Sequence, residues 1–384
     1  MKKILACLLT AAMLFSFAPM CFASEALPEM QVEVKAKAAV LMDAGSGKVL
    51  MAQNAHEKLY PASVTKIMTL LLVTEAIDSG KISLTDMVTV SKEAAEKGGS
   101  QIWLEVGEQM SVDDLLKASA VASANDACEA LAEYVAGSSD AFVRQMNERA
   151  QQLGMNDTHF ENCTGLDDTV ENHVTSAYDV ALMSRELLRH QRITGYTTIW
   201  MDSLRNGETQ LVNTNKLIRF YEGATGLKTG TTSKAGCCVS ASAKRGDLHL
   251  IAVVLGSDTS DDRFNAARAM LDWGFANYTT EKLEIDASRV PAVGVLKGTE
   301  SSVMPVIPQA QAVLIEKGKT GEVVQEFDLA ATVQAPVEKG QLLGRVYFKL
   351  NGETLYTYDL ISDREIPALT FFESFKRILL SLCT

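Results

Sequence analysis

The chain has 384 residues, 47% of them hydrophobic and 22% charged, which is the composition of a folded protein long enough for two domains. Its formal net charge of −12 argues against a nucleic-acid-binding protein, because phosphate contacts need a basic surface. The same charge disfavours electrostatic attraction to anionic lipid, so any membrane attachment must be apolar.

The N-terminus has the pattern of a secretory signal. Lys2 and Lys3 form a basic start, a nearly continuous apolar run covers residues 4–17, and Ala23 is a small residue suited to cleavage. The alternative is a membrane-spanning or core helix, but the run is short for a span. We therefore expect residues 1–23 to be a signal peptide and the rest of the chain to be exported.

The cysteines and histidines predict neither a disulfide framework nor a metal site. Five cysteines would remain after cleavage, an odd number with one adjacent pair. They are Cys128, Cys163, Cys237, Cys238 and Cys383. No spacing among these residues or the five histidines matches a zinc site, so we expect no metal and no other cofactor.

Residues 24–280 are expected to form an α+β domain. Strand-like runs lie near its two ends, and helical periodicity fills the region between them. The expected strands are residues 38–42, 48–52, 236–243 and 249–256, and the expected helices are residues 67–77, 111–136, 138–153 and 263–278. A sheet built from both ends of the segment, with helices inserted between them, is the predicted architecture.

The last hundred residues change character twice. In residues 281–365, short β-branched runs alternate with Gly, Pro and Lys turns, which predicts a small all-β domain. Residues 366–384 form an amphipathic helix in which Phe371, Phe372 and Phe375 share one face. This helix is too short to span a bilayer but suited to lie in its surface; packing on the β domain is the alternative.

The first chemical motif is Ser63-Val-Thr-Lys66, at the start of the expected buried helix. A serine hydroxyl is a poor nucleophile until a neighbouring base takes its proton. Lys66 lies one helical turn after Ser63, and an amine whose pKa is depressed by burial can act as that base.

Two further motifs follow in order. Ser123-Ala-Asn125 offers a hydroxyl that can relay protons and an amide that can bind a peptide backbone, although small polar residues also cap or bend helices. Lys228-Thr-Gly230 is followed by Thr231, Thr232 and a strand. Lys228 could hold a carboxylate, Gly230 leaves room for the serine's helix, and the Thr231 and Ser63 N–H groups could form an oxyanion hole. A second copy, Lys319-Thr-Gly321, is expected to be a hairpin turn without chemistry.

This ordered trio resembles the low-molecular-weight penicillin-binding proteins, the serine D-alanyl-D-alanine carboxypeptidases of the peptidase S11 type. The similarity is close over residues 36–280, and the order of signal, first domain, β-rich domain and tail helix is also similar. The matching stretches are residues 60–69, 122–127, 164–168 and 226–231. The resemblance implies a β-lactamase/transpeptidase-like fold for the first domain.

The resemblance also implies a role for each motif residue. Ser63 would be the acylated nucleophile and Lys66 the general base, while Ser123 would shuttle protons. The substrate-binding residues would be Asn125, Lys228, Thr229, Gly230 and Thr231. The implied partners are peptidoglycan stem peptides, β-lactams as covalent inhibitors, and the outer face of the cytoplasmic membrane through the tail helix.

One departure from the family concerns carboxylate binding. Some members carry Asn-Arg-Asn upstream of the third motif, whereas this chain has Asn213-Thr-Asn215 followed by Lys216. Lys216 or Arg219 could substitute for that arginine. Cys128, one turn past Asn125, is expected to be a small buried hydrophobe.

Three alternatives remain at this point. A β-lactamase shares the trio but needs a glutamate to activate water, and neither Glu161 nor Glu171 has the context of that residue. A catalytically silent cell-wall binding or scaffold protein would not need both Ser63 and Lys66. A transpeptidase differs only in the nucleophile that attacks the acyl-enzyme.

Overall fold

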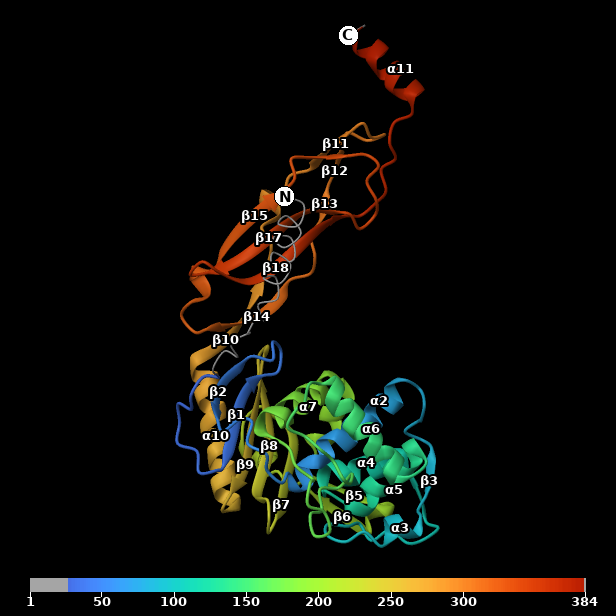
Figure 1. Cartoon of the computed structure of the whole chain (residues 1–384), viewed down its shortest axis with the longest axis vertical. Coiled ribbons are helices and arrows are strands. Elements are labelled where there is room, and N and C mark those ends of the chain that lie inside the picture. Colours follow the sequence, from blue (N-terminus) through green and yellow to red (C-terminus); the bar gives the residue numbers. More distant parts are fainter. Residues whose placement is uncertain (1–26, 383–384) are drawn as a thin grey trace, which may run out of the picture.

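The computed structural model describes residues 27–382. The predicted signal peptide, residues 1–23, and Cys383 lie outside the described residues. The chain forms a globular part at one end and an elongated β-rich part that extends away from it (Figure 1). The last helix, α11 (Phe371–Leu382), lies at the far end of the elongated part (Figure 1).

An antiparallel sheet forms the centre of the globular part. Its strands, in spatial order, are β2 (Val49–Gln53), β1 (Ala38–Asp43), β9 (Leu248–Ser257), β8 (Gly236–Arg245) and β7 (Ala224–Thr232). Ala38 pairs with Leu255 and Asp43 with Leu250, so strands from the two ends of the segment meet in the middle of the sheet. This confirms the predicted α+β architecture, but β7 was missed as a strand because two glycines and Lys228 interrupt its apolar pattern.

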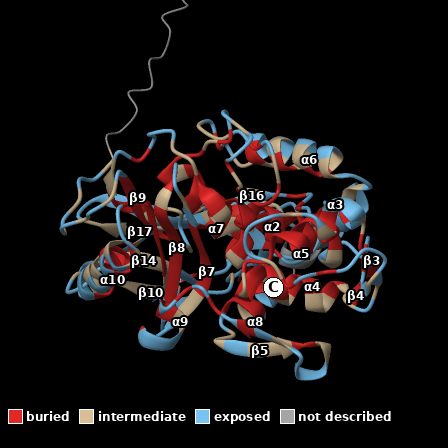
Figure 2. Cartoon of the chain, turned by 90° about the horizontal axis from the view of Figure 1, so that it is seen from below, coloured by how far each residue is buried: buried red, intermediate tan, exposed pale blue. Residues whose placement is uncertain are grey.

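Helices cover both faces of this sheet. One face carries α2 (Lys66–Asp78), α4 (Val112–Val121), α5 (Asn125–Ala136), α6 (Ser139–Gln152) and α7 (Ala177–Arg189), and the other carries α10 (Ser260–Asn277). The predicted caps Ser111 and Ser138 each accept a hydrogen bond from the first turn of α4 and α6. Buried residues are concentrated along the strands and the helices packed on them (Figure 2).

Several short elements complete the globular part. They are η1 (Ala62–Thr65), β3 (Met87–Thr89), α3 (Lys92–Ala95), β4 (Gln109–Ser111), η2 (Gln191–Ile193), α8 (Thr194–Thr197), β5 (Met201–Leu204), η3 (Arg205–Gly207), β6 (Thr209–Val212) and α9 (Leu217–Phe220). The pairs β3–β4 and β5–β6 are separate two-stranded sheets. They lie beside the helical layer rather than in the central sheet (Figure 1).

The elongated part is the predicted small all-β domain. Its strands are β10 (Tyr278–Leu283), β11 (Val293–Leu296), β12 (Ser302–Val303), β13 (Pro305–Val306), β14 (Gln311–Glu316), β15 (Val324–Leu329), β16 (Thr332–Gln334), β17 (Leu342–Leu350) and β18 (Glu353–Ser362). The 3₁₀ turns are η4 (Ala287–Arg289) and η5 (Thr320–Glu322). Two small hydrophobic cores of its own, around Val337 and Val346, hold this part together.

The second Lys-Thr-Gly, residues 319–321, lies at η5 between β14 and β15. The prediction of a hairpin there is wrong, because β14 pairs with β10 whereas β15 pairs with β17. Lys319 forms an ion pair with Glu316 on the surface.

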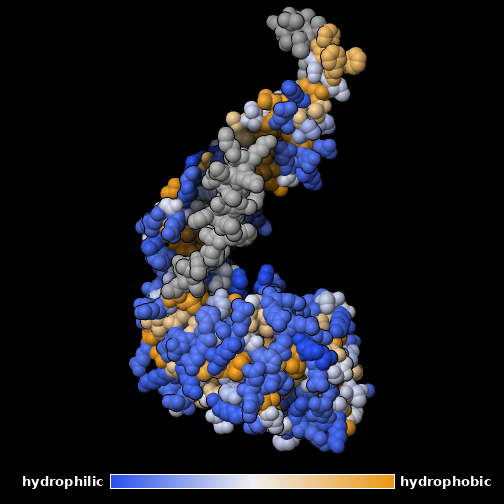
Figure 3. Space-filling view, in the orientation of Figure 1, coloured by the Kyte–Doolittle hydropathy of each residue, from blue (hydrophilic) through white to orange (hydrophobic). Residues whose placement is uncertain are grey.

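The tail helix begins at a capping box, in which the Glu373 N–H bonds to Thr370 Oγ1 and the Glu373 carboxylate accepts the Thr370 N–H. Phe371, Phe372 and Phe375 are 78%, 81% and 53% exposed, and apolar residues mark this end of the molecule in Figure 3. Among the described helices, none has the length and hydropathy that a transmembrane segment requires.

Candidate active site

Ser63 and Lys66 meet at the start of α2. Lys66 Nζ lies 2.8 Å from Ser63 Oγ and donates a hydrogen bond to the Thr164 carbonyl, also at 2.8 Å. The Lys66 side chain is fully buried, and this burial lowers the pKa of its amine. A neutral amine has a lone pair, so Lys66 can accept a proton from the hydroxyl beside it.

A buried histidine holds the turn that carries Ser63. Ala62 has a left-handed φ of 49°, and Thr65 Oγ1 closes the turn by donating to the Ala62 carbonyl at 2.9 Å. His173 Nε2 lies 2.8 Å from Thr65 Oγ1, and its Nδ1 accepts the Glu161 N–H at 3.0 Å. Burial lowers the pKa of His173 to about 4, so the ring is neutral and its Nε2–H donates to Thr65.

The Thr164 segment passes directly against this turn. Gly165 has a φ of 85°, and a Cβ added there would lie 1.8 Å from the Ala62 carbonyl oxygen. Asn162 Oδ1 accepts the N–H groups of Thr164 and Gly165 and so fixes the segment. The close approach brings the Thr164 carbonyl to the Lys66 amine.

Ser123 and Asn125 lie on a sharp turn between α4 and α5. The predicted single helix over residues 111–136 is wrong, because the chain breaks at Ser123, whose φ is 62°. Asn125 donates from its backbone to Ser100 O and from Nδ2 to Gly98 O, both at 2.7 Å. Its Oδ1 is buried and has no hydrogen-bond partner among residues 27–382. A buried unsatisfied acceptor is costly, which suggests that a ligand supplies the missing donor.

The third motif lies within β7, at the edge of the sheet. Lys228 is buried, and its Nζ donates to the Thr229 carbonyl at 2.9 Å. Burial lowers the pKa of Lys228 well below its usual range, and the neighbouring charges of Lys66 and Arg263 lower it further. Burial raises the pKa of the Cys128 thiol, while the charges of Lys66 and Lys228 act against that shift. Lys66 and Lys228 therefore lie close enough for their charges to interact, and Cys128, which is buried as predicted, lies near both.

Gly230 is where β7 touches the serine's turn. A Cβ added at Gly230 would lie 2.8 Å from Ser63 N and 2.9 Å from Pro61 O, so only glycine fits, which confirms the steric part of the prediction. The next peptide N–H along β7 belongs to Thr231. The backbone amides of Ser63 and Thr231 are thus neighbours, as an oxyanion hole requires.

Arg263, in the first turn of α10, is a site residue that the motifs did not reveal. Its Nη1 donates to Gly230 O at 2.8 Å, to Thr231 Oγ1 at 2.9 Å and to Cys238 O at 3.1 Å. Its side chain is buried, and no carboxylate pairs with it within the described part of the chain. One signal was available in the sequence, since a cation is disfavoured at a helix N-terminus unless another contact requires it.

Thr214 occupies the position where some relatives have arginine. Thr229 Oγ1 donates to Thr214 Oγ1 at 2.7 Å, so the loop before α9 reaches the third motif. The two cations suggested as substitutes are engaged elsewhere. Lys216 pairs with Asp261 at 3.9 Å, and Arg219 stacks on the rings of Trp200 and Phe220.

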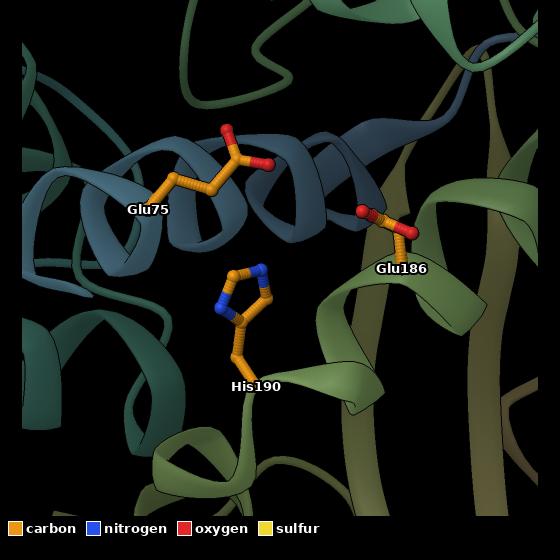
Figure 4. A group of neighbouring side chains, drawn as sticks. All are labelled: Glu75, Glu186 and His190. Carbon is orange, nitrogen blue, oxygen red and sulfur yellow. The ribbon is translucent and has the colours of Figure 1, made fainter. Parts of the chain in front are cut away.

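A second cluster of ionisable groups lies outside this site. Glu75, Glu186 and His190 converge between α2 and the end of α7 (Figure 4). Arg149 bridges the two glutamates at 2.7 and 2.9 Å, and His190 is 2.6 Å from Asp78. The cluster is thus explained as an ion-pair network that joins three helices.

Comparisons with known proteins agree with this geometry. Residues 24–259 match the family model of the D-alanyl-D-alanine carboxypeptidases, peptidase S11, and residues 278–368 match the C-terminal domain of penicillin-binding protein 5. The chain belongs to the peptidase S11 family. The predictions of the family and of a serine D-alanyl-D-alanine carboxypeptidase are therefore confirmed.

Relatives match along most of this peptidase S11 chain. The D-alanyl-D-alanine carboxypeptidase DacF of Bacillus subtilis is 42% identical over 382 residues, 98% of each chain. The structure of penicillin-binding protein 5 from Haemophilus influenzae superposes with a TM-score of 0.76 at 34% identity, covering 88% of this chain and 99% of that one. Penicillin-binding protein D2 from Listeria monocytogenes, in its ampicillin-bound form, has a TM-score of 0.59 at 31% identity and covers 64% of this chain and 100% of its own.

Proposed function

We propose that this carboxypeptidase removes the terminal D-alanine from peptidoglycan stem peptides, with Ser63 as nucleophile and Lys66 as general base. The observation that carries the proposal is the buried Lys66 amine 2.8 Å from the Ser63 hydroxyl. Lys66 accepts the hydroxyl proton as Ser63 Oγ attacks the carbonyl of the D-Ala-D-Ala bond. The negative charge that develops on that oxygen is stabilised by the Ser63 and Thr231 N–H groups.

The remaining motif residues orient the peptide and move the proton. Ser123 returns the proton to the leaving amine, and the unpartnered Asn125 Oδ1 accepts a substrate N–H. The terminal carboxylate binds at Lys228 and Thr229, and its charge favours the protonated form of the Lys228 amine. Water then hydrolyses the Ser63 ester, which releases the shortened stem.

The same serine is the proposed site of acylation by β-lactams, as expected for a penicillin-binding protein. The contacts of Glu161 give no support to a β-lactamase. Its carboxylate accepts the Asn172 N–H at 3.0 Å within its own loop and so has a structural role. Rapid hydrolysis of a penicillin would favour the β-lactamase alternative.

We also propose that residues 1–23 direct export, that residues 24–280 carry the chemistry, and that residues 366–384 bind the outer face of the cytoplasmic membrane. Three exposed phenylalanines at one end of the molecule support this attachment (Figure 3). The β domain, residues 281–365, would then hold the site away from the lipid (Figure 1).

Release of D-alanine tests the function. The chain without residues 1–23 should liberate D-alanine from a peptide that ends in D-Ala-D-Ala, and Ser63→Ala should abolish this release. Continued release by the Ser63→Ala protein would overturn the proposal. Transfer of the acyl group to an added amine, in place of hydrolysis, would assign a transpeptidase.

A further inference from the structure

The loop between α3 and β4 carries an exposed tryptophan next to the active site. Trp103 is 76% exposed, whereas the other two tryptophans, Trp200 and Trp273, are half-buried. Its neighbours Ile102 and Leu104 are both buried. Ile102 and Leu104 therefore anchor the loop, while the larger apolar side chain of Trp103 stays in solvent. This exposure is unfavourable, because burial of apolar surface stabilises the fold.

Two charged side chains clamp the backbone around Trp103. The buried Asp126 carboxylate accepts the N–H groups of Ile102 and Leu104, each at 3.1 Å. Arg205 donates to Ile102 O at 2.8 Å and to Trp103 O at 3.4 Å, and its guanidinium is held by Glu108 at 2.8 and 3.0 Å. Charge-assisted hydrogen bonds thus fix the peptide groups on both sides of the indole.

The clamp holds Trp103 in an unfavourable backbone conformation. Its φ is 59°, in the left-handed region that a bulky side chain rarely adopts. Such conformations persist where the surrounding structure enforces them, and they cluster at functional sites. Both the strain and the exposure oppose folding stability, so a role in binding explains them better than a role in the core.

The clamp also ties the loop to the second catalytic motif. Asp126 directly follows Asn125, and Asn125 itself bonds to Gly98 O and Ser100 O at the start of the loop. Three residues of extended chain span at most about 10 Å, so Trp103 lies within that distance of Ser100. The indole is thus within reach of the larger substrate to which a stem peptide is attached.

We propose that Trp103 is a stacking platform for a sugar ring of the glycan strand that carries the stem peptide. Pyranose rings present flat C–H faces that pack on aromatic rings, with hydroxyls at the rim for polar neighbours such as Gln101 and Glu105. The inference rests on the proposed function, because it assigns a second contact to the same substrate.

The alternatives to a sugar fit less well. The acidic Glu105 and the net charge of −12 disfavour contact with an anionic membrane. α3, where this loop begins, lies at the opposite end of the molecule from α11, so the loop faces away from a membrane bound through the tail (Figure 1). One indole flanked by polar residues is also a small area for a stable protein partner.

Two substrates with the same stem pentapeptide test the proposal, one free and one linked to its disaccharide. Trp103→Ala should lower kcat/KM for the disaccharide-linked substrate about tenfold, the effect of one lost aromatic stacking contact, and leave the free peptide within about twofold. Trp103→Phe keeps an aromatic ring, so it should lose less kcat/KM for the disaccharide-linked substrate than Trp103→Ala. Val106→Ala, at a residue of the same loop that is 64% exposed, is the matched control and should change kcat/KM for neither substrate.

If Trp103→Ala lowers kcat/KM equally for both substrates, or for neither, the proposal that Trp103 stacks on a sugar ring is overturned. An unchanged rate of acylation by benzylpenicillin, which contains no sugar, would show that the Trp103→Ala site is intact. If the wild type cleaves neither substrate, the proposed function fails, and tryptophan fluorescence during titration with the disaccharide then decides the inference by itself. A change in wild type that is lost in Trp103→Phe supports the platform, and no change in wild type overturns it.

Discussion

Buried positive charge dominates the site at the scale of single residues. Lys66, Lys228 and Arg263 are each at most 7% exposed, and all three have lowered pKa values because burial disfavours the charged form. An arginine remains protonated even when its pKa is lowered, so only the amines of Lys66 and Lys228 can become neutral. The arrangement allows Lys66 to act as a base while the site as a whole attracts a carboxylate.

The spacing of the motifs predicted contacts between residues that are near each other in the sequence. It did not predict contacts that form only when distant segments pack together. Ser63 and Lys66 share a helix start, so their contact follows from local geometry. Arg263 reaches Gly230 only because α10 packs behind the sheet. Thr214 reaches Thr229 only through the loop after β6. Such contacts depend on tertiary packing and have no short-range pattern.

Gly230 provides a prediction at this scale. Gly230→Ala should slow acylation by benzylpenicillin by at least about 100-fold, because the new Cβ must displace the Ser63 amide from the oxyanion hole. Overpacking should also lower the free energy of unfolding by roughly 1–3 kcal/mol. Stopped-flow acylation and urea unfolding measure the two effects.

Gly195→Ala is the control for this variant, because a Cβ at Gly195 would meet nothing within 4 Å. It should leave the acylation rate unchanged. A Gly230→Ala protein that acylates at the wild-type rate would show that β7 does not need its close approach to Ser63.

At the scale of elements, the two errors in the globular part have a common cause. The strand β7 and the break between α4 and α5 both depend on tertiary contacts around the site. β7 contains Gly226, Lys228 and Gly230, which are unfavourable in an isolated strand, but pairing with β8 and packing on η1 hold them in one. The break at Ser123 is fixed by the Asn125 backbone bond to Ser100, from a distant loop.

The turn that carries Ser63 depends on an uncharged His173, which predicts a pH effect on stability. The pKa of His173 is about 4 in the folded protein and near 6.5 when unfolded, so between these values the unfolded state binds the extra proton. The free energy of unfolding should therefore fall as pH decreases from 6.5 towards 4, by up to about 3 kcal/mol from this residue.

Urea unfolding of wild type and His173→Gln across this range measures the effect. The variant should be less stable at neutral pH, and its stability should fall less steeply as pH decreases. His56→Gln, at an exposed position away from His173, serves as the control. Parallel curves for wild type and His173→Gln would mean that folding does not lower the pKa of His173.

At the scale of the whole molecule, the proposed catalytic site and the proposed membrane anchor lie in different parts of the chain. The proposed catalytic residues all lie in the globular part, whereas the exposed phenylalanines belong to α11, at the distant end of the elongated part (Figure 1). The solved chain of penicillin-binding protein D2 covers 64% of this chain with 100% of its own length, so that chain has no counterpart to the remaining part. The sequence predicted this order of parts well, because each part has its own periodicity and composition.

Replacement of Phe371, Phe372 and Phe375 by serine tests the attachment. The variant should lose at least about tenfold in binding to phosphatidylcholine vesicles, since each phenylalanine contributes roughly 1.5–3 kcal/mol when buried in an apolar phase. Its release of D-alanine should equal that of the wild type. Vesicle flotation measures binding, and undiminished flotation of the variant would rule out the tail face as the anchor.

The central claim is that a neutral Lys66 activates the Ser63 hydroxyl. Mass spectrometry of the protein after timed exposure to benzylpenicillin, over a range of pH, tests it most directly. The wild type should gain one penicillin on the peptide that contains Ser63, at a rate that falls as lower pH protonates Lys66. Lys66→Arg, whose guanidinium stays charged, should be acylated at least about 1,000-fold more slowly. Acylation of Lys66→Arg at the wild-type rate, or an adduct on another residue, would contradict this account.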